Sequence, residues 1–235
     1  MLYLNKVVLV TGSSRGVGRE IAVHFLEQGA KVIGISRGNG SIDDEMYTHF
    51  EVDLSEAKLI PEVFFEIRKK FTEIHIVINN AGVLTSQYSM IMPPMAAQQM
   101  VNVNLLAPFL VSRESAKFMR KTKWGRIINI GSMAASLEPI GDSVYAACKA
   151  GLSTLANVMA KEFSSMNVTC NTLGVNAIES EMLQQLPRDT IDNIIKSLPV
   201  PRYSTIEDVS NILDFYCSDK SSSITAQTIF LGGVN

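Results

Sequence analysis

The sequence has no apolar run near the roughly 18 residues needed to cross a bilayer, and its first residues, MLYLNK, lack the apolar core of a signal peptide. We therefore expect a cytoplasmic protein that does not enter a membrane. A charge excess is lacking too, because 21 Lys and Arg stand against 23 Asp and Glu, for a net charge of −2. This balance argues against a surface that coats nucleic acid.

Cysteine is scarce, and the three cysteines are too widely spaced to form a recognisable motif: Cys148, Cys170 and Cys217. No Cys-x-x-Cys pair is present to hold a metal or to form a redox disulfide, so we expect buried free thiols. The three histidines, His24, His49 and His75, also lack the spacing of metal ligands. We predict no metal site.

What the chain does have is 46% hydrophobic side chains in 235 residues, without linkers or repeats. A chain of this size can bury a full core, so we predict a single α/β domain over residues 1–235. Residues 6–18, KVVLVTGSSRGVG, organise it. The apolar run 7–10 does not alternate and predicts a strand buried on both faces, followed by a glycine turn and a helix that Gly29 closes.

Each glycine of this turn answers a physical need. Gly12 permits a sharp exit from the strand, Gly16 leaves no side chain between the backbone and an anion, and Gly18 lets the helix lie close to the strand. The helix N-terminus favours a pyrophosphate at this place. We therefore predict that this turn of a dinucleotide-binding fold contacts the cofactor through its glycines and through Ser14, Arg15 and Val17.

The end of the second predicted strand, residues 31–36, selects the cofactor. An acid here would bind the ribose 2′-hydroxyl of NAD, whereas a hydroxyl and an arginine suit the 2′-phosphate of NADP. Ser36 and Arg37 occupy this place, with Arg15 as a second cation, so we predict NADP(H). Solvated surface arginines are the alternative interpretation. A polar connector, residues 38–46, replaces a second helix.

Further strand ends carry small or polar residues that let a ligand approach. Asp53 and Leu54 follow a third strand, residues 47–52, where the acid could accept a hydrogen bond from the adenine amino group or cap a helix that starts near Glu56. A fourth strand, residues 74–78, leads into the sequence Asn-Asn-Ala-Gly, from which we predict contacts of Asn80, Ala81 and Gly82 with the cofactor.

Downstream, Pro108 removes the N–H that would bond to the carbonyl of Asn104, so we expect a helix kink that leaves this carbonyl free to hold a water. A basic cluster follows, which is either a solvated helix end or a docking surface for an acidic partner. Its members are Arg113, Lys117, Arg120, Lys121, Lys123 and Arg126.

Tyr145 and Lys149 stand at i and i+4 of a predicted helix, so both side chains project from one face. A cation about 4 Å from a phenol, at an effective dielectric near 20, is worth on the order of 4 kcal/mol and would lower the phenol pKa by roughly three units. Tyr145 could then act as a general acid. Ser132, at the end of a fifth strand, could hold a substrate carbonyl oxygen, and Asn104 with its water could pass protons to Lys149.

With these motifs together, the chain resembles the short-chain dehydrogenases/reductases over essentially all its length. The resemblance implies a doubly wound fold, with helices on both faces of a central parallel sheet, and a catalytic tetrad of Asn104, Ser132, Tyr145 and Lys149. Within the family the chain is most similar to the 3-oxoacyl-[acyl-carrier-protein] reductases of fatty acid biosynthesis. That similarity implies NADPH, a homotetramer or homodimer, and a carbonyl substrate that is free or bound to a carrier protein.

The chain departs from the family pattern in its last third. Val175-Asn176 replaces the usual Pro-Gly, and Gly232 stands where an acid is usual. Ile178 and Ser180 match the positions that meet the nicotinamide carboxamide and the phosphates. Residues of about 181–203 form the expected mobile lid over the substrate. Its apolar side chains could line an acyl tunnel or pack as a helix face: Met182, Leu183, Leu186, Ile191, Ile194 and Ile195.

These patterns predict an NADPH-dependent reductase in which Tyr145 protonates the carbonyl oxygen that Ser132 holds, with a 3-oxoacyl thioester as the leading substrate. Lys149 is expected to bind the nicotinamide ribose and to lower the Tyr145 pKa, so Tyr145 and Lys149 are also predicted cofactor contacts. One rival has the same chemistry on another small molecule, such as a sugar, a polyol or a biosynthetic ketone. A second rival, of a different class, is a catalytically silent NADP-binding regulatory protein.

Overall fold

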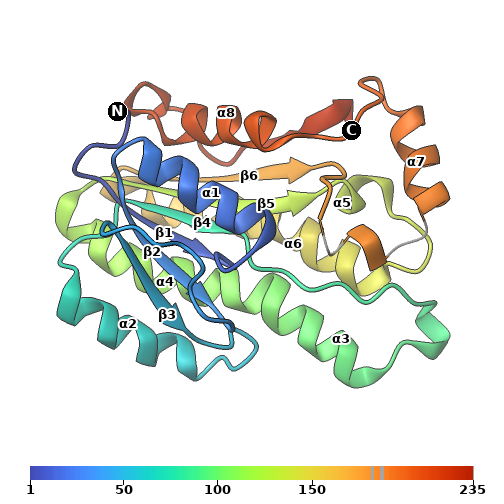
Figure 1. Ribbon diagram of the computed structural model, residues 1–235, viewed down its shortest axis with the longest axis horizontal. Helices are drawn as coiled ribbons and strands as arrows, with labels where there is room; N and C mark the ends of the chain where they lie inside the picture. The colour runs from blue at the N-terminus through green and yellow to red at the C-terminus, as the bar shows by residue number, and fades with distance from the viewer. Residues whose placement is uncertain (181–182, 186–187, 235) are drawn as a thin grey trace.

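A computed structural model describes residues 1–180, 183–185 and 188–234. Within these residues, seven strands form one sheet in the order β3-β2-β1-β4-β5-β6-β7, and every neighbouring pair is parallel (Figure 1). This sheet confirms the predicted doubly wound α/β fold. The strands are β1 (Val7–Thr11), β2 (Lys31–Ser36), β3 (Tyr47–Glu51), β4 (Ile76–Asn79), β5 (Gly125–Ser132), β6 (Val168–Val175) and β7 (Thr228–Phe230).

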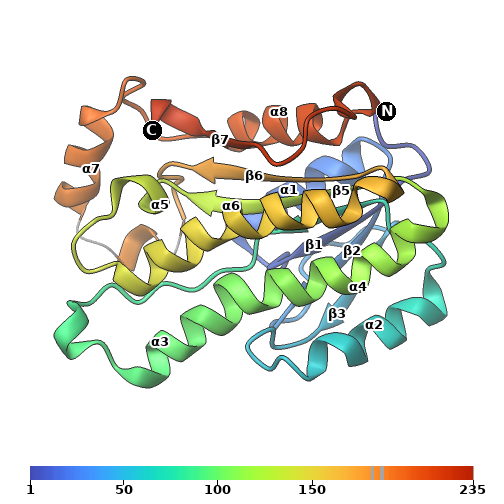
Figure 2. The same ribbon diagram turned by 180° about the vertical axis from the view of Figure 1, so that it is seen from behind.

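Helices cover both faces of the sheet, as Figures 1 and 2 show from opposite sides. The residues of β1 are apolar throughout because both faces of this strand are buried. Val7 and Leu9 belong to one core cluster, and Val8 and Val10 belong to the other. The first cluster contains buried side chains of α2 (Leu59–Lys70), α4 (Ala107–Thr122) and α6 (Ser143–Phe163). The second contains those of α1 (Gly16–Glu27) and α8 (Ile206–Cys217).

The connector between β2 and β3 contains no helix, as expected from its polar composition. Helix α2 begins later than expected, at Leu59, and its N-cap residue Lys58 makes no capping hydrogen bond. The prediction that Asp53 caps a helix near Glu56 is therefore wrong. Asp53 instead accepts a hydrogen bond from the Ser55 N–H at 2.9 Å, which closes a local turn before the helix.

The expected kink at Pro108 takes a different form. Helix α3 (Pro94–Val101) continues through a π-helical turn, η2 (Asn102–Leu106), into α4, and Figure 2 shows α3 and α4 lying end to end. The N–H of Ala107 donates to the carbonyl of Asn102, five residues back. A π turn inserts one residue into the helix and shifts the hydrogen-bond pattern, so Pro108 is accommodated without a break.

The basic cluster is smaller than the sequence suggested. Arg126 is fully buried on β5 and donates to the backbone carbonyls of Gly125 and Ser218. Arg113 and Lys117 both pair with the buried carboxylate of Glu114, at 2.9 and 2.6 Å. The cluster therefore offers less unpaired positive charge to an acidic partner than expected.

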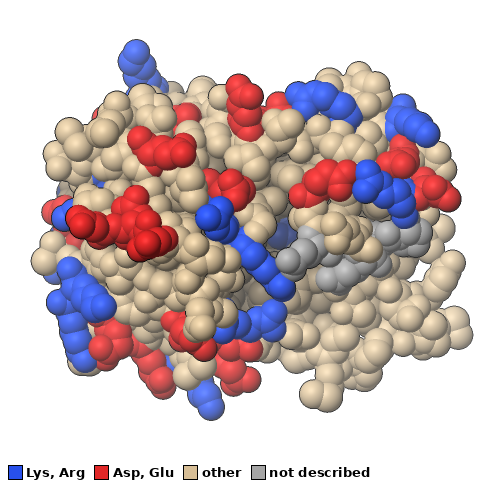
Figure 3. Space-filling view, viewed as in Figure 1, with Lys and Arg blue, Asp and Glu red and all other residues tan. Residues whose placement is uncertain are grey.

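One lobe of the surface is free of charge. Figure 3 shows mixed charges on the left and upper parts of this face, and an uncharged lobe at the lower right, over α3. The segment before α3 contains the short 3-10 turn η1 (Ser89–Ile91), and the exposed apolar side chains of this region include Tyr88, Met90 and Met95. Among the described helices, none is both long and apolar enough to traverse a bilayer.

Gly18 allows α1 to pack against the glycine turn. A Cβ at this position would lie 2.2 Å from the carbonyl oxygen of Gly12 and 2.3 Å from Nδ2 of Asn80. We predict that Gly18→Ala lowers the free energy of unfolding by roughly 1–3 kcal/mol, measured by urea denaturation. The added methyl group would force the backbone at Gly12 to move. Gly151→Ala in α6 is the control, since its Cβ would meet only the end of the Leu105 side chain. Equal effects of the two changes would contradict this account.

Candidate active site

The candidate site lies at the carboxyl ends of the strands, where the strand order reverses between β1 and β4. This is the place at which open parallel sheets bind ligands. Thr11 and Asn80 join the two strand ends: Thr11 Oγ1 accepts hydrogen bonds from the N–H groups of Asn80 and Ala81, both at 3.0 Å. Asn80 Nδ2 donates to the carbonyl of Thr11 at 3.0 Å. The Asn-Asn-Ala-Gly segment is thereby fixed against the glycine turn.

The glycine turn is shaped as an anion site requires. Gly12 and Gly16 both have positive φ, at 72° and 55°, which favours glycine over other residues. A Cβ at Gly16 would meet nothing within 4 Å, so the turn faces open space at the start of α1. The helix N-terminus adds a favourable dipole there, and the turn therefore fits the pyrophosphate of a dinucleotide.

Gly82 brings two members of the predicted tetrad together. A Cβ on Gly82 would lie 3.2 Å from Oδ1 of Asn104 and 3.7 Å from Nζ of Lys149. The Asn104 side chain is fully buried, accepts from the N–H of Val83 at 2.9 Å and donates to its carbonyl at 2.8 Å. The Asn104 side chain is therefore occupied in holding the segment after β4. The proton relay predicted for this residue would use its backbone carbonyl.

Tyr145 and Lys149 are both buried near the end of β5. Lys149 Nζ donates to the Ile130 carbonyl at 2.8 Å and lies 5.8 Å from the centre of the Tyr145 ring. Burial raises the pKa of Tyr145 to about 12; a hydrogen bond with Ser132 lowers this pKa and the Asp142 carboxylate raises it. Burial likewise lowers the pKa of Lys149 to about 8.

These shifts correct the expectation that Lys149 depresses the phenol pKa. The structure brings Ser132, Tyr145 and Lys149 together as predicted, but the loss of hydration on burial is the largest cause of the pKa shift of both Tyr145 and Lys149. Both groups are shifted toward their neutral forms. The phenol is therefore protonated at neutral pH, as a proton donor must be.

The residues predicted to bind the adenosine end of the cofactor lie at or just after the ends of the neighbouring strands β1 and β2. Ser36 is buried at the end of β2, and its hydroxyl donates to the carbonyl of Gly38 at 3.1 Å, whereas Arg37 is exposed beside it. Ser14 and Arg15 come from the neighbouring glycine turn, and Ser41 donates to the carbonyl of Ser14 at 2.7 Å. The Leu54 side chain is buried in the core, so only its backbone can meet a ligand.

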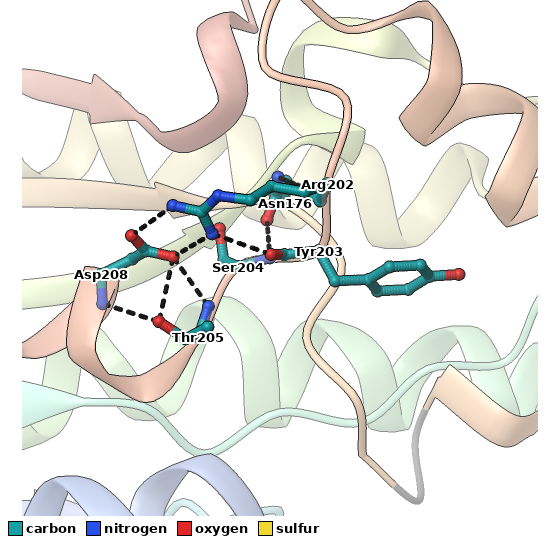
Figure 4. A network of polar contacts seen from close by, with 6 residues as sticks. All are labelled: Asn176, Arg202, Tyr203, Ser204, Thr205 and Asp208. Atoms are coloured by element: carbon teal, nitrogen blue, oxygen red, sulfur yellow. Dashed lines mark hydrogen bonds and ion pairs between the residues drawn. The ribbon is translucent and has the colours of Figure 1, made fainter.

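Asn176, the first residue after β6, has a structural role where the family usually has Pro-Gly. The buried Asn176 side chain donates to the Arg202 carbonyl at 3.2 Å and accepts from the Ser204 N–H at 3.1 Å (Figure 4). Arg202 forms a two-point ion pair with Asp208, which also completes a capping box with Thr205 at the start of α8. Asn176 therefore ties the strand end to the far end of the predicted lid.

The predicted lid contains α7 (Arg188–Ser197), which lies beside α5 (Ala134–Leu137) beyond the ends of β5 and β6 (Figures 1 and 2). Ile191 and Ile195 are buried in one cluster with Ala177, Leu198 and Val234, and Leu183 packs against it. This favours a packed helix face over an acyl tunnel for these residues. Met182 and Leu186 lie outside the described residues.

The remaining candidates near this segment use local hydrogen bonds. Ser180 Oγ accepts from the Leu183 N–H at 3.3 Å, and Ile178 packs against the second core cluster. Both stay predicted cofactor contacts. No group of side chains suited to a metal ion occurs in the described part of the chain, and the three cysteines are buried free thiols as expected.

The sequence interpretation missed two polar residues beside the site, Tyr47 and His49, and it noted Asn176 without its hydrogen-bond partners. Tyr47 and His49 bond to each other at 3.0 Å, and His49 Nε2 lies 2.8 Å from the Gly38 carbonyl. Their alternation on one face of β3 was a usable signal, because a strand at a sheet edge seldom places two such groups together without a partner. The partners of Asn176 gave no comparable signal, since they lie 26 and 28 residues away in the sequence.

Comparison with known proteins identifies the family. A family model described as short chain dehydrogenase matches residues 6–191. The chain belongs to the short-chain dehydrogenase family. It is an oxidoreductase of the kind that acts on CH–OH or C=O groups, and this family binds a nicotinamide cofactor.

Curated relatives of this short-chain dehydrogenase include two bacterial enzymes of one name. The 3-oxoacyl-[acyl-carrier-protein] reductase FabG of Salmonella typhimurium is 32% identical over 99% of this chain and 98% of its own. The Aquifex aeolicus FabG is also 32% identical, over 97% and 96%. Among solved structures, the aldohexose dehydrogenase of Thermoplasma acidophilum superposes with a TM-score of 0.90 at 24% identity, over 99% of this chain and 94% of that one. That likeness shows the shared fold.

The lowered pKa of Lys149 gives a test by pH. Because its folded pKa, about 8, lies below the ordinary 10.5, the unfolded chain binds more protons between these values. The contribution of Lys149 to the free energy of unfolding should therefore rise with pH from about 8 to 10.5. We predict that this rise is present in the unaltered protein and absent from Lys149→Met, in urea denaturation at several pH values. NMR of the lysine ε-carbons that placed Lys149 near 10.5 would contradict this account.

Proposed function

We propose that this protein is an NADPH-dependent reductase that converts a carbonyl to a secondary alcohol, with a 3-oxoacyl thioester as its substrate. The observation that carries the proposal is the buried pair of Tyr145 and Lys149 beside Ser132, at the sheet edge where the glycine turn opens. The bound nicotinamide would supply the hydride. We also propose a cytoplasmic location and a homotetramer or homodimer, as the resemblance implies.

The cofactor would lie along the strand ends. The glycine turn, through Gly12, Gly16 and Gly18 with Ser14, Arg15 and Val17, would hold the pyrophosphate. Ser36 and Arg37 would bind the 2′-phosphate, and Asp53 with Leu54 would border the adenine. The segment of Asn80, Ala81 and Gly82 would pass the riboses, and Ile178 and Ser180 would meet the nicotinamide end. The open space at Gly16 and the exposure of Arg37 support this placement.

Side chains of this protein would deliver the proton to the substrate oxygen. Ser132 would hold the carbonyl oxygen, and the Tyr145 hydroxyl would give its proton to that oxygen as negative charge develops on it. A phenol with a pKa of about 12 is still far more acidic than an alcohol, so the transfer is downhill. Lys149 would return a proton to Tyr145, and a water held by the Asn104 carbonyl would in turn supply Lys149. A phenol that stays protonated supports the reductive direction.

The thioester substrate rests on the full-length similarity to enzymes named 3-oxoacyl-[acyl-carrier-protein] reductase. Two structural observations favour another small carbonyl compound as the second candidate. Ile191 and Ile195 pack into a core cluster instead of lining a tunnel, and Glu114 neutralises two of the cations that a carrier protein would meet. Sugars, polyols and biosynthetic ketones are the classes to compare.

A substrate panel separates the two candidates. We predict NADPH oxidation with acetoacetyl thioesters of coenzyme A and of acyl carrier protein, with kcat/KM at least about tenfold above that for free ketones and sugars. Absorbance at the NADPH band follows the reaction. Turnover of ketones or sugars without any turnover of thioesters would contradict the first candidate and support the second.

Tyr145→Phe separates the enzyme from a silent regulatory protein. The change keeps the ring and removes only the proton donor, so we predict that kcat falls by at least roughly 10²-fold, the scale of general acid catalysis. NADPH affinity, measured by isothermal titration calorimetry, should change less than about threefold. An unaltered protein without turnover on any carbonyl, whose cellular activity survives Tyr145→Phe, would favour the regulatory interpretation.

The cofactor assignment predicts that NADPH binds at least roughly tenfold more tightly than NADH, or about 1.4 kcal/mol. Arg37→Asp should erode this preference, because the new carboxylate repels the 2′-phosphate. Arg120→Asp is the control, since it makes the same charge change on an exposed site of α4. Equal affinities in the unaltered protein would contradict the roles of Ser36 and Arg37.

A further inference from the structure

Side chains of the glycine turn and of β3 form a chain of hydrogen bonds that ends on a backbone carbonyl of the connector that follows β2. Ser13 Oγ, in the glycine turn, lies 3.0 Å from Oη of Tyr47, and this Oη lies 3.0 Å from Nδ1 of His49. His49 Nε2 lies 2.8 Å from the carbonyl oxygen of Gly38. The chain therefore links the glycine turn to the loop that carries Arg37.

The partners fix the direction of these hydrogen bonds. The Gly38 carbonyl can only accept, so Nε2 of His49 carries a proton, and in the tautomer protonated only at Nε2 the Nδ1 atom is an acceptor. The Tyr47 hydroxyl therefore donates to Nδ1, and Ser13 donates to Tyr47. Burial raises the pKa of Tyr47 while the bond with Ser13 lowers it, which is the effect expected when Ser13 is the donor.

Two glycines make room for this chain. A Cβ at Gly34 of β2 would lie 2.0 Å from Tyr47 Oη and 2.4 Å from Ser13 Oγ, so the bond crosses β2 at a position without a side chain. A Cβ at Gly40 would lie 2.9 Å from the Cβ of His49, so the connector passes directly over this residue. Close backbone approach at both positions requires glycine.

Ser36 connects this chain to the proposed cofactor site. Its hydroxyl donates its one proton to the Gly38 carbonyl at 3.1 Å, and its oxygen also lies 3.3 Å from Nε2 of His49. If that proton turns to a phosphate oxygen, the carbonyl keeps its hydrogen bond from His49 Nε2, at 2.8 Å. The Ser36 hydroxyl can thus change partners without leaving this acceptor unpaired.

We propose that His49 is a positioning residue for recognition of the 2′-phosphate of NADP(H): it holds the Gly38 carbonyl and so releases the Ser36 hydroxyl to the phosphate. This inference rests on the proposed function, because it concerns the same cofactor. It also assigns Tyr47 and Ser13 the task of fixing the tautomer and orientation of His49. His49 then contributes to the choice between NADPH and NADH without touching either.

The test is calorimetric titration of NADPH and NADH against His49→Leu, His49→Gln and the unaltered protein. The His49→Leu change removes the donor to Gly38, and we expect roughly three- to tenfold weaker NADPH binding, the scale of one hydrogen bond. NADH binding should change less than about twofold. His49→Gln, whose amide N–H can reach the same carbonyl, should recover most of the loss.

An equal loss for both cofactors, or no loss for either, would overturn the role of His49. If His49→Leu does not fold, as judged by circular dichroism, Tyr47→Phe decides instead: it keeps the ring, removes the donor to His49, and should selectively weaken NADPH binding. An unaltered protein that binds the two cofactors equally would overturn the NADP assignment and this inference together. An intact preference that survives in both variants would overturn the inference alone.

Discussion

Every neighbouring pair of strands in the sheet is parallel, and this constraint places all the candidate chemistry at one edge. Parallel strands deliver their carboxyl ends to the same side, so Thr11, Asn79 and Ser132 meet there although long helices separate them in the chain. The same geometry buries the central strands on both faces. Water is therefore excluded from the floor of the site, and the pKa values of Tyr145 and Lys149 follow from that exclusion.

Much of the fold could be read from the sequence, because its signals are local. The apolar run before the glycine turn, the bounds of β2 and the helix-free connector all follow from residues that act on their own neighbours. The predictions that were wrong concern groups for which several hydrogen-bond partners compete. Asp53 closes a turn instead of capping α2, and a π turn accommodates Pro108, because each backbone group takes the partner that the folded chain brings nearest.

The sequence could predict which candidate residues lie close together, but it could not predict their electrostatics. The spacing of Tyr145 and Lys149 gives their shared face, yet only the folded chain shows that Lys149 donates to Ile130 and that burial dominates both pKa values. Long-range partners were equally hidden. Asn176 binds residues 202 and 204, and the chain through Tyr47 and His49 depends on Gly34 in another strand. Such features depend on tertiary packing, which the sequence pattern does not encode locally.

The account depends centrally on Tyr145 being a buried phenol that stays protonated until a substrate oxygen takes its proton. Ultraviolet difference titration of the unaltered protein against Tyr145→Phe measures this directly, because the two proteins differ only in that phenol. We predict that the phenolate band assigned to Tyr145 is absent up to about pH 10 and develops near pH 12. A band with its midpoint near neutral pH would contradict the account.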